Sequence, residues 1–258
     1  MERRILGRTG LDVGRLGISA SYGVPAQAVE QAFERGVNYL YWGSMRRGSF
    51  GQALRNLKPR RDRMVLVLQS YTRVAALMRP SVEMALRKVG FEYADVLLLG
   101  LWNHLPPARI LDAAAALRER GFIRHIAVST HHRPLAEQLA ANSNIGIVHV
   151  RYNAAHTGAE REVFPMLGGL AKPPGAVAFT ATSWRQLLNP KRVPQGEKIP
   201  TAADCYRFVL SNPAVDVCMT GPSTAAHVEQ SLRAADACPM PDEELAWMRR
   251  VGDYIHGH

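Results

Sequence analysis

Short apolar runs recur along the whole chain, and the segments between several of them carry apolar residues at helical spacing. Runs this short, with almost no polar residues, are typical of strands that are buried on both faces of a sheet. The pattern predicts eight strands, at 16–19, 37–42, 64–69, 96–99, 126–129, 145–150, 176–180 and 217–220.

Between these strands, apolar residues repeat every three or four positions, as on one face of a helix. The clearest faces are Val29, Ala32 and Phe33; Val82, Ala85, Leu86 and Val89; and Ile110, Leu111, Ala114 and Leu117. Gly90 and Gly121 follow the second and third faces, and glycine commonly ends a helix because it adopts left-handed backbone angles without strain. A last helix is predicted at 242–251, beyond the final strand.

Strands that alternate with helices pair in parallel through crossover connections, and eight such units in 258 residues match a (β/α)8 barrel. No Gly-x-Gly-x-x-Gly segment follows a predicted strand, which argues against a doubly wound dinucleotide-binding fold. No linker rich in proline, glycine or serine divides the chain. We therefore predict an α/β protein with one domain, residues 1–258, folded as a TIM barrel.

The chain carries 32 Lys and Arg against 22 Asp and Glu, a formal net charge of +10, and 47% of its residues are hydrophobic. This hydrophobic share excludes a disordered chain. The densest basic cluster, 58–63, is a short connector without interleaved aromatic residues. We expect a solvated basic surface that attracts an anionic cofactor, and no nucleic-acid partner.

The three cysteines, Cys205, Cys218 and Cys238, are too few and too far apart for a disulfide framework or a Cys-x-x-Cys metal site. No apolar stretch approaches the length of a membrane span, and no apolar leader follows Met1. These features predict a soluble, cytoplasmic protein without a membrane partner.

In a (β/α)8 barrel the chemistry lies where the strands end. The strand ends of this chain carry aromatic, amide, hydroxyl and imidazole groups but almost no carboxylates. Such a site is poorly suited to glycoside hydrolysis, which needs a carboxylate pair, or to a divalent metal ion. Of the histidines, one of His131, His132 or His149 could do acid–base work, although a single histidine at a strand end is more often structural.

Several segments, in this order and spacing, resemble the aldo-keto reductase family. They are 6–13 (LGRTGLDV), 36–40 (GVNYL), 51–54 (GQAL), 93–99 (YADVLLL), 121–129 (GFIRHIAVS), 151–153 (RYN), 209–213 (VLSNP) and 228–232 (VEQSL). The resemblance implies a barrel plugged at its bottom by an N-terminal β-hairpin. It also implies NADP(H), or alternatively NAD(H), bound across the mouth, a small-molecule carbonyl or alcohol substrate, and a monomer or homodimer.

The four catalytic residues of that family, a Tyr, an Asp, a Lys and a His, are not recognisable here. The Asp position holds Tyr41, the Tyr position holds Arg46, or Arg47 with a one-residue slip, the Lys position holds Gln69, and the His position holds Gly100. A positioned general acid contributes about 10²- to 10⁴-fold in rate, so a substitute is needed.

We predict Tyr41 as the substitute proton donor, with Arg46 lowering its pKa or stabilising an oxyanion, and with help from His131 and His149. The alternative is that Tyr41 only packs at the mouth and that Arg46 is a solvated loop residue. The substrate side is predicted to include Trp42, Gln69, Trp102 and Asn103.

The cofactor side of the family pattern is better preserved. By resemblance, Ser129, with Thr130 and His149 in place of an Asn and a Gln, would contact the nicotinamide amide, and Phe179 would stack on its ring. The phosphate region comprises Gly221, Ser223, Thr224 and His227, at what we predict to be a helix N-terminus. His227 stands where the family has an Arg for the 2′-phosphate, which leaves the choice between NADPH and NADH open.

Two functions remain open from the sequence. One is an NAD(P)H-dependent oxidoreductase that works through a non-standard site. The other is a barrel that has lost redox chemistry and binds a ligand or partner without turnover.

Overall fold

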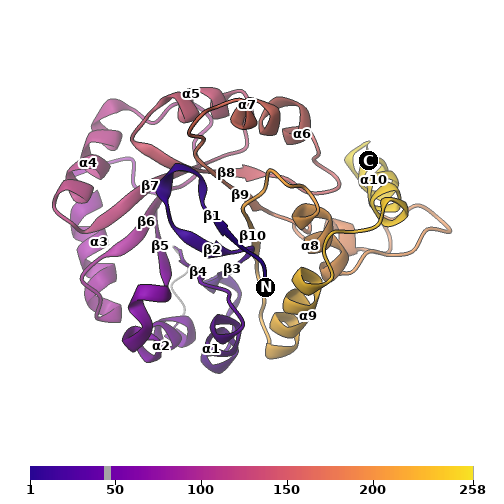
Figure 1. Ribbon diagram of the computed structural model, residues 1–258, viewed down its shortest axis with the longest axis horizontal. Coiled ribbons are helices and arrows are strands. Elements are labelled where there is room, and N and C mark those ends of the chain that lie inside the picture. Colours follow the sequence, from indigo (N-terminus) through magenta and orange to yellow (C-terminus); the bar gives the residue numbers. More distant parts are fainter. Residues whose placement is uncertain (44–47, 258) are drawn as a thin grey trace.

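The computed structural model describes residues 1–43 and 48–257. Parallel strands close into a barrel in the order β10-β3-β4-β5-β6-β7-β8-β9, which Figure 1 shows in projection. The strands are β3 (Leu16–Ser19), β4 (Tyr39–Trp42), β5 (Val65–Ser70), β6 (Ala94–Leu99), β7 (Ile123–Thr130), β8 (Ile145–Arg151), β9 (Gly175–Phe179) and β10 (Val217–Thr220). The predicted α/β TIM barrel is confirmed.

Helices cover the outside of the barrel and connect its strands (Figure 1). They are α1 (Ala26–Glu34), α2 (Gly48–Asn56), α3 (Ala75–Val89), α4 (Ala108–Glu119), α5 (Leu135–Ala141), α6 (Ala159–Glu162), α7 (Phe164–Gly168), α8 (Ala202–Leu210), α9 (Ala225–Asp236) and α10 (Asp242–Gly257). Gly90 ends α3 in the left-handed conformation, with φ 72°. The last helix, α10, is longer than predicted and lies outside the ring of strands, next to α8.

Most strand boundaries differ from the predicted ones by a few residues. The clearest case is β7, which begins at Ile123 rather than at residue 126 because it pairs with β6 from Ala94↔Ile123 onward. Arg124 and His125 interrupt the apolar pattern there. Their backbone still joins the sheet, because strands pair through main-chain N–H and C=O groups. The pattern of apolar side chains gives no information about these groups.

Alternation along each strand produces two separate cores. Inward positions such as Tyr39, Val67 and Ile147 fill the barrel interior. Outward positions such as Leu40 and Trp42 pack in a second core with the helices. A residue's place in this alternation therefore decides whether its side chain can reach the barrel mouth.

The bottom of the barrel is closed by an N-terminal hairpin in which β1 (Arg3–Ile5) pairs antiparallel with β2 (Asp12–Gly14). Leu6 and Val13 are fully buried in the inner core. The predicted hairpin plug is thus present, and it leaves the opposite, C-terminal end of the strands for the site. Within the described residues, no helix is both long and apolar enough to span a membrane.

Candidate functional site

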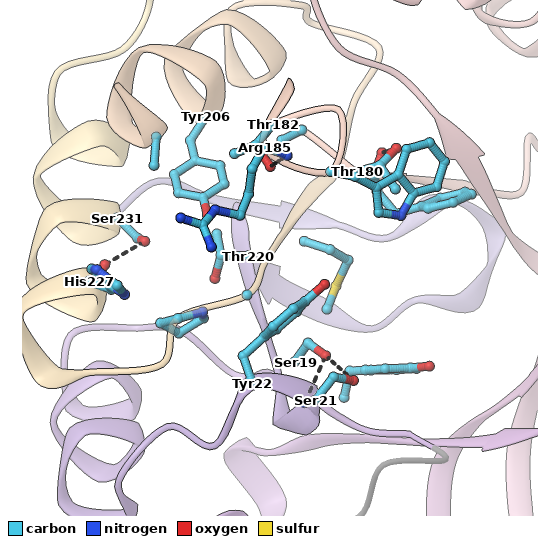
Figure 2. A pocket seen from close by; sticks show the side chains of 18 of the residues that line it. Ser19, Ser21, Tyr22, Thr180, Thr182, Arg185, Tyr206, Thr220, His227 and Ser231 are labelled. Carbon is cyan, nitrogen blue, oxygen red and sulfur yellow. Dashed lines mark hydrogen bonds between the residues drawn. The ribbon is translucent and has the colours of Figure 1, made fainter. Parts of the chain in front are cut away.

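A cavity of about 800 Å³ opens at the C-terminal ends of the strands. This volume is typical of a small-molecule or cofactor site. Its wall is built mainly by strand ends and the loops that follow them, together with the starts of α8 and α9 (Figure 2). The predicted site residues that line it are Tyr41, Gln69, Ser129, His131, His149, Phe179, Gly221, Ser223 and His227.

Other predicted residues do not line the cavity. Trp42 and Thr130 occupy outward positions of β4 and β7, and both side chains are buried away from the barrel interior. The Thr130 hydroxyl instead accepts a hydrogen bond from the backbone N–H of His132, at 2.9 Å. Thr224 is the N-cap of α9, where its hydroxyl accepts from the backbone N–H of His227.

Trp102 and Asn103, predicted on the substrate side, lie in the segment after β6 and do not line the cavity either. Trp102 is buried outside the cavity lining, and the Arg73 guanidinium lies 3.6 Å from the centre of its ring. Asn103 is exposed and also stands outside the lining. Arg46, predicted to assist Tyr41, lies outside the described residues.

Tyr41 and Gln69 meet in the cavity wall. Both occupy inward positions on neighbouring strands, β4 and β5, and the Tyr41 hydroxyl donates a hydrogen bond to Oε1 of Gln69. This contact holds the phenol at the barrel mouth, where a bound carbonyl could receive its proton. The structure thus brings together Tyr41 and Gln69, which we predicted from the sequence to stand at the family's Asp and Lys positions.

Tyr39 and His149 form a hydrogen bond across the barrel, below Tyr41. Their strands, β4 and β8, stand on opposite sides of the ring, and the Tyr39 hydroxyl lies 2.8 Å from Nε2 of His149. His149 also lines the cavity, so this contact forms part of its floor. Burial lowers the pKa of His149 to about 3, and the imidazole is therefore neutral near pH 7.

The direction of this hydrogen bond follows from the burial of Tyr39, which is fully buried. Burial, with a smaller contribution from Tyr41, raises the pKa of Tyr39 far above its usual range, so its O–H proton is retained. Among the described residues His149 is the one hydrogen-bond partner of this hydroxyl. Because an unsatisfied buried donor is costly, Tyr39 donates to Nε2, and His149 carries its own proton on Nδ1. Nδ1–H is the donor left for a ligand.

Replacing Tyr39 by phenylalanine is expected to lower the free energy of unfolding by about 1–3 kcal/mol, because Nε2 of His149 would lose its buried partner. The proton of His149 would then no longer be confined to Nδ1. Urea unfolding measures the first effect, and ¹⁵N chemical shifts of the imidazole measure the second. Tyr71→Phe, at a half-exposed residue, is the matched control. An unchanged ¹⁵N spectrum of His149 in Tyr39→Phe would contradict the assigned proton position.

The loop after β9 contributes residues to which the sequence analysis assigned no role in the site. Thr180, Ser183, Trp184 and Arg185 all have left-handed backbone angles, with φ between 49° and 70°. Non-glycine residues adopt these angles at a cost of about 1 kcal/mol or more each, and such strain clusters at functional sites. No glycine marks the loop in the sequence, so no local signal could have revealed it.

Aromatic rings gather beside this loop. The His131 ring contacts Phe179 edge-on at 5.2 Å and stacks on Trp184 at 5.7 Å, as measured between ring centres. Arg185 lines the cavity, and Figure 2 shows its side chain extending into it on the side where Tyr206 stands. Within the described part of the chain, the Arg185 guanidinium makes no hydrogen bond or ion pair.

The opposite end of the cavity is formed by the start of α9. The Ser223 hydroxyl lies 3.1 Å from Nδ1 of His227. The Ser231 hydroxyl donates to the His227 carbonyl oxygen at 2.8 Å (Figure 2). Gly221 and Ser223 line the cavity beside the first turn of this helix. The backbone N–H groups of such a turn favour an anion.

The charge of the cavity wall is one-sided. Among the described lining residues there is an arginine and there are histidines, but no aspartate, glutamate or lysine. No group of three or more histidine, cysteine, aspartate or glutamate side chains suited to a metal ion occurs in residues 1–43 and 48–257. The wall therefore offers hydrogen-bond donors and positive charge, which suit a polyanionic organic ligand.

The family model of the aldo/keto reductases matches residues 18–173. This match covers more than half of the chain, and the chain belongs to the aldo/keto reductase family. The motifs that suggested this family in the sequence lie on the N-terminal hairpin, on barrel strands and the segments beside them, and on helices α2, α8 and α9.

Solved structures of the same family share the fold. The holo form of an aldo-keto reductase from Bacillus halodurans gives a TM-score of 0.78 at 22% identity, covering 97% of this chain and 96% of that chain. An aldo/keto reductase from Klebsiella pneumoniae, solved in complex with NADP and acetate, gives a TM-score of 0.79 at 20% identity, covering 98% of this chain and 96% of that chain.

Proposed function

We propose that this protein is an NADP(H)-dependent oxidoreductase that acts on a carbonyl or alcohol substrate. The observation that carries the proposal is the donor-rich cavity without lining carboxylates at the barrel mouth, in a chain of the aldo/keto reductase family. The Klebsiella relative with the same fold was solved with NADP. NADPH is the expected form, with NADH as the alternative.

The cavity has residues suited to each part of the dinucleotide. Ser223 and the first-turn amides of α9 suit the adenosine phosphate, with His227 beside them. Arg185 suits the diphosphate, because a guanidinium binds phosphate oxygens in a fork. At the other end, the Phe179 ring can stack on the nicotinamide, and Nδ1–H of His149 can donate to its amide oxygen.

When bound, NADP(H) supplies hydride transfer. The chain must then supply a proton to the carbonyl oxygen on which negative charge develops, and we assign this role to Tyr41. In the structure the Tyr41 hydroxyl donates to Oε1 of Gln69, and this hydrogen bond orients the phenol. During the reaction the substrate oxygen would take the place of Oε1 as the acceptor. His149 is uncharged near neutral pH and acts as a hydrogen-bond donor.

Titration with NADPH and with NADH, followed by tryptophan fluorescence, tests the proposal directly. Trp184 stands in the cavity wall and reports on its occupation. Saturable NADPH binding, together with cofactor oxidation in the presence of an aldehyde, is expected. If neither nucleotide binds, the proposal is overturned.

A second candidate function is binding without redox turnover. Support for it comes from the sequence prediction that Tyr41, Gln69 and Gly100 stand at the family's Asp, Lys and His positions. Saturable NADPH binding with no turnover over a broad panel of aldehydes and ketones would support this function and reject the first.

Substituting Arg185 by alanine is expected to weaken the binding of NADPH and NADH alike by about tenfold, since the diphosphate is common to both. His227→Ala is expected to weaken NADPH more than NADH. Fluorescence titration gives both dissociation constants. Arg192→Ala, an exposed arginine outside the cavity lining, is the matched control and should bind both as the wild type does. Unchanged affinities in Arg185→Ala would exclude the diphosphate contact.

A further inference from the structure

Arg151 lies at the barrel mouth, and among residues 1–43 and 48–257 it has no counter-ion. It is the last residue of β8, in register with Phe179 of β9, and it follows His149 on the inward-facing side of the strand. Its side chain is partly buried. In the part of the chain that the structure describes, its guanidinium makes no hydrogen bond, ion pair or ring contact. Arginine in such a position usually has an anionic partner.

The charged groups that shift the pKa of Arg151, His131 and His156 are cationic. Burial lowers the pKa of Arg151, and Arg133 lowers it further. Burial and then Arg151 lower the pKa of His131. The pKa of His156 falls to about 4, first through burial and then through Arg151, with smaller effects of His256, Arg133 and His131. No carboxylate appears among these influences.

The nearby carboxylates are engaged elsewhere. Glu162 pairs with Nε of Arg133 at 2.9 Å, and Glu160 binds both terminal nitrogens of Arg249 at 2.9 Å. Arg133 therefore has its own carboxylate partner, whereas no described carboxylate pairs with Arg151. The positive charge without a described partner belongs to Arg151, which pairs in the sheet with Phe179, the residue whose ring the His131 ring contacts.

His156 is held in an orientation that lets it join an anion. Its Nδ1 lies 3.1 Å from Oδ1 of Asn153, and this oxygen also accepts from the backbone N–H of Ala155 at 3.0 Å. The amide oxygen can only accept, so the His156 proton is on Nδ1. Nε2 remains free to take up a second proton, which would make the ring a cationic donor. The ring also contacts His256 of α10 edge-on, at 5.2 Å.

We propose that Arg151, His156 and His131 form a binding site for an oxyanion, namely a carboxylate or phosphate group. A guanidinium fork matches such a group in geometry and charge, and the anion would offset the repulsion among the three side chains. All three are partly open to solvent, so the group can enter. His131 also lines the main cavity, which makes the oxyanion site its direct neighbour. The site goes beyond the proposed redox function and its test needs no turnover.

The test is a titration of the full chain, without nucleotide, with sulfate and with acetate, followed by NMR of the histidine C2–H signals. Sulfate represents a phosphate group with a charge that is constant over the pH range used. Saturable shifts of the His131 and His156 signals are expected, with chloride at equal ionic strength as the baseline. Acetate should bind about tenfold more tightly at pH 5.5 than at pH 8, because an anion raises the pKa of His156 and binding takes up a proton.

Matched variants distinguish specific binding at Arg151 from nonspecific attraction of anions to the basic surface. Arg151→Gln should weaken sulfate binding by about tenfold or more, whereas Arg161→Gln, an exposed arginine on nearby α6, should change it by no more than about twofold. His156→Gln should remove most of the pH dependence and retain binding at pH 8. Arg151→Lys keeps the positive charge but lacks the two parallel N–H donors of the guanidinium. It should also weaken sulfate binding, and it serves as a second variant in case Arg151→Gln does not fold. Shifts that never saturate, or equal affinity in wild type and both Arg151 variants, would overturn the proposal.

A displacement experiment distinguishes two sources of the anion: a charged group on the ligand in the main cavity, or a separate anion beside that cavity. 4-Carboxybenzaldehyde and its methyl ester are added to the sulfate-bound protein. Displacement by the acid alone assigns the site to the anionic group of a cavity ligand. If neither compound displaces sulfate, the oxyanion is a separate ligand beside the cavity. Either result leaves the nucleotide titration as an independent test of the redox function.

Discussion

Tyr41→Phe is expected to lower kcat/KM for carbonyl reduction by about 10²- to 10⁴-fold, because it removes the phenolic proton donor at the cavity wall. The ring remains, so the packing of β4 should be preserved. The Tyr41 hydroxyl is held by Gln69 on the neighbouring strand, and both side chains line the cavity. The effect should fall mainly on kcat, since the hydroxyl stabilises the developing oxyanion rather than the bound cofactor.

Steady-state kinetics with NADPH and a reducible aldehyde give the comparison, and fluorescence titration shows whether NADPH binding is retained. Tyr93→Phe is the matched control, because this tyrosine lies at the other end of the barrel, where its hydroxyl accepts from Arg124. If Tyr41→Phe binds NADPH normally and turns over at the wild-type rate, Tyr41 is not the proton donor.

Asp95→Ala is expected to lower the free energy of unfolding by about 3–5 kcal/mol, because it leaves buried positive charge and a backbone donor without a partner. The Asp95 side chain is 1% exposed, and its Oδ2 lies 2.7 Å from Nη1 of Arg61. The same oxygen accepts from the backbone N–H of Leu66 at 2.8 Å. Arg124 approaches the other carboxylate oxygen at 3.4 Å.

Urea unfolding of the wild type and the variant measures this difference. Asp95→Asn is the matched control, because its amide oxygen can still accept from Leu66 and Arg61 and its volume is nearly unchanged. Its loss should therefore be clearly smaller. Equal losses in both variants would mean that the charge, and not the acceptor, supplies the stability. A loss below about 1 kcal/mol in Asp95→Ala would contradict the role assigned to this carboxylate.

Much of the candidate site followed from the strand pattern. Tyr41, Gln69 and Ser129 were selected as strand-end residues, and His149 and Phe179 through the family resemblance. The structure places all of them in one cavity wall. Trp42 and Thr130 were selected by the same rule but lie on the outward face. The difference is the phase of the alternation. In a strand that is apolar on both faces, the residue types alone do not reveal which positions face inward.

Other features depended on contacts between distant segments. The bond from Tyr39 to His149 joins opposite strands of the closed ring, and it determines which ring nitrogen of His149 faces a ligand. The lack of a described carboxylate partner for Arg151 likewise depends on tertiary contacts, because Glu162 pairs with Arg133 and Glu160 pairs with Arg249. Neither relation leaves a local mark in the sequence.

The sequence by itself determined the barrel, because buried parallel strands and amphipathic helices leave periodic patterns along the chain. It indicated the family through the order and spacing of segments that resemble the family's motifs. Only the tertiary structure decided the protonation of His149, the left-handed course of 183–185 and the surplus charge at Arg151. These properties arise from burial and from electrostatic neighbours, and both are set by residues that are remote in the chain and adjacent in space.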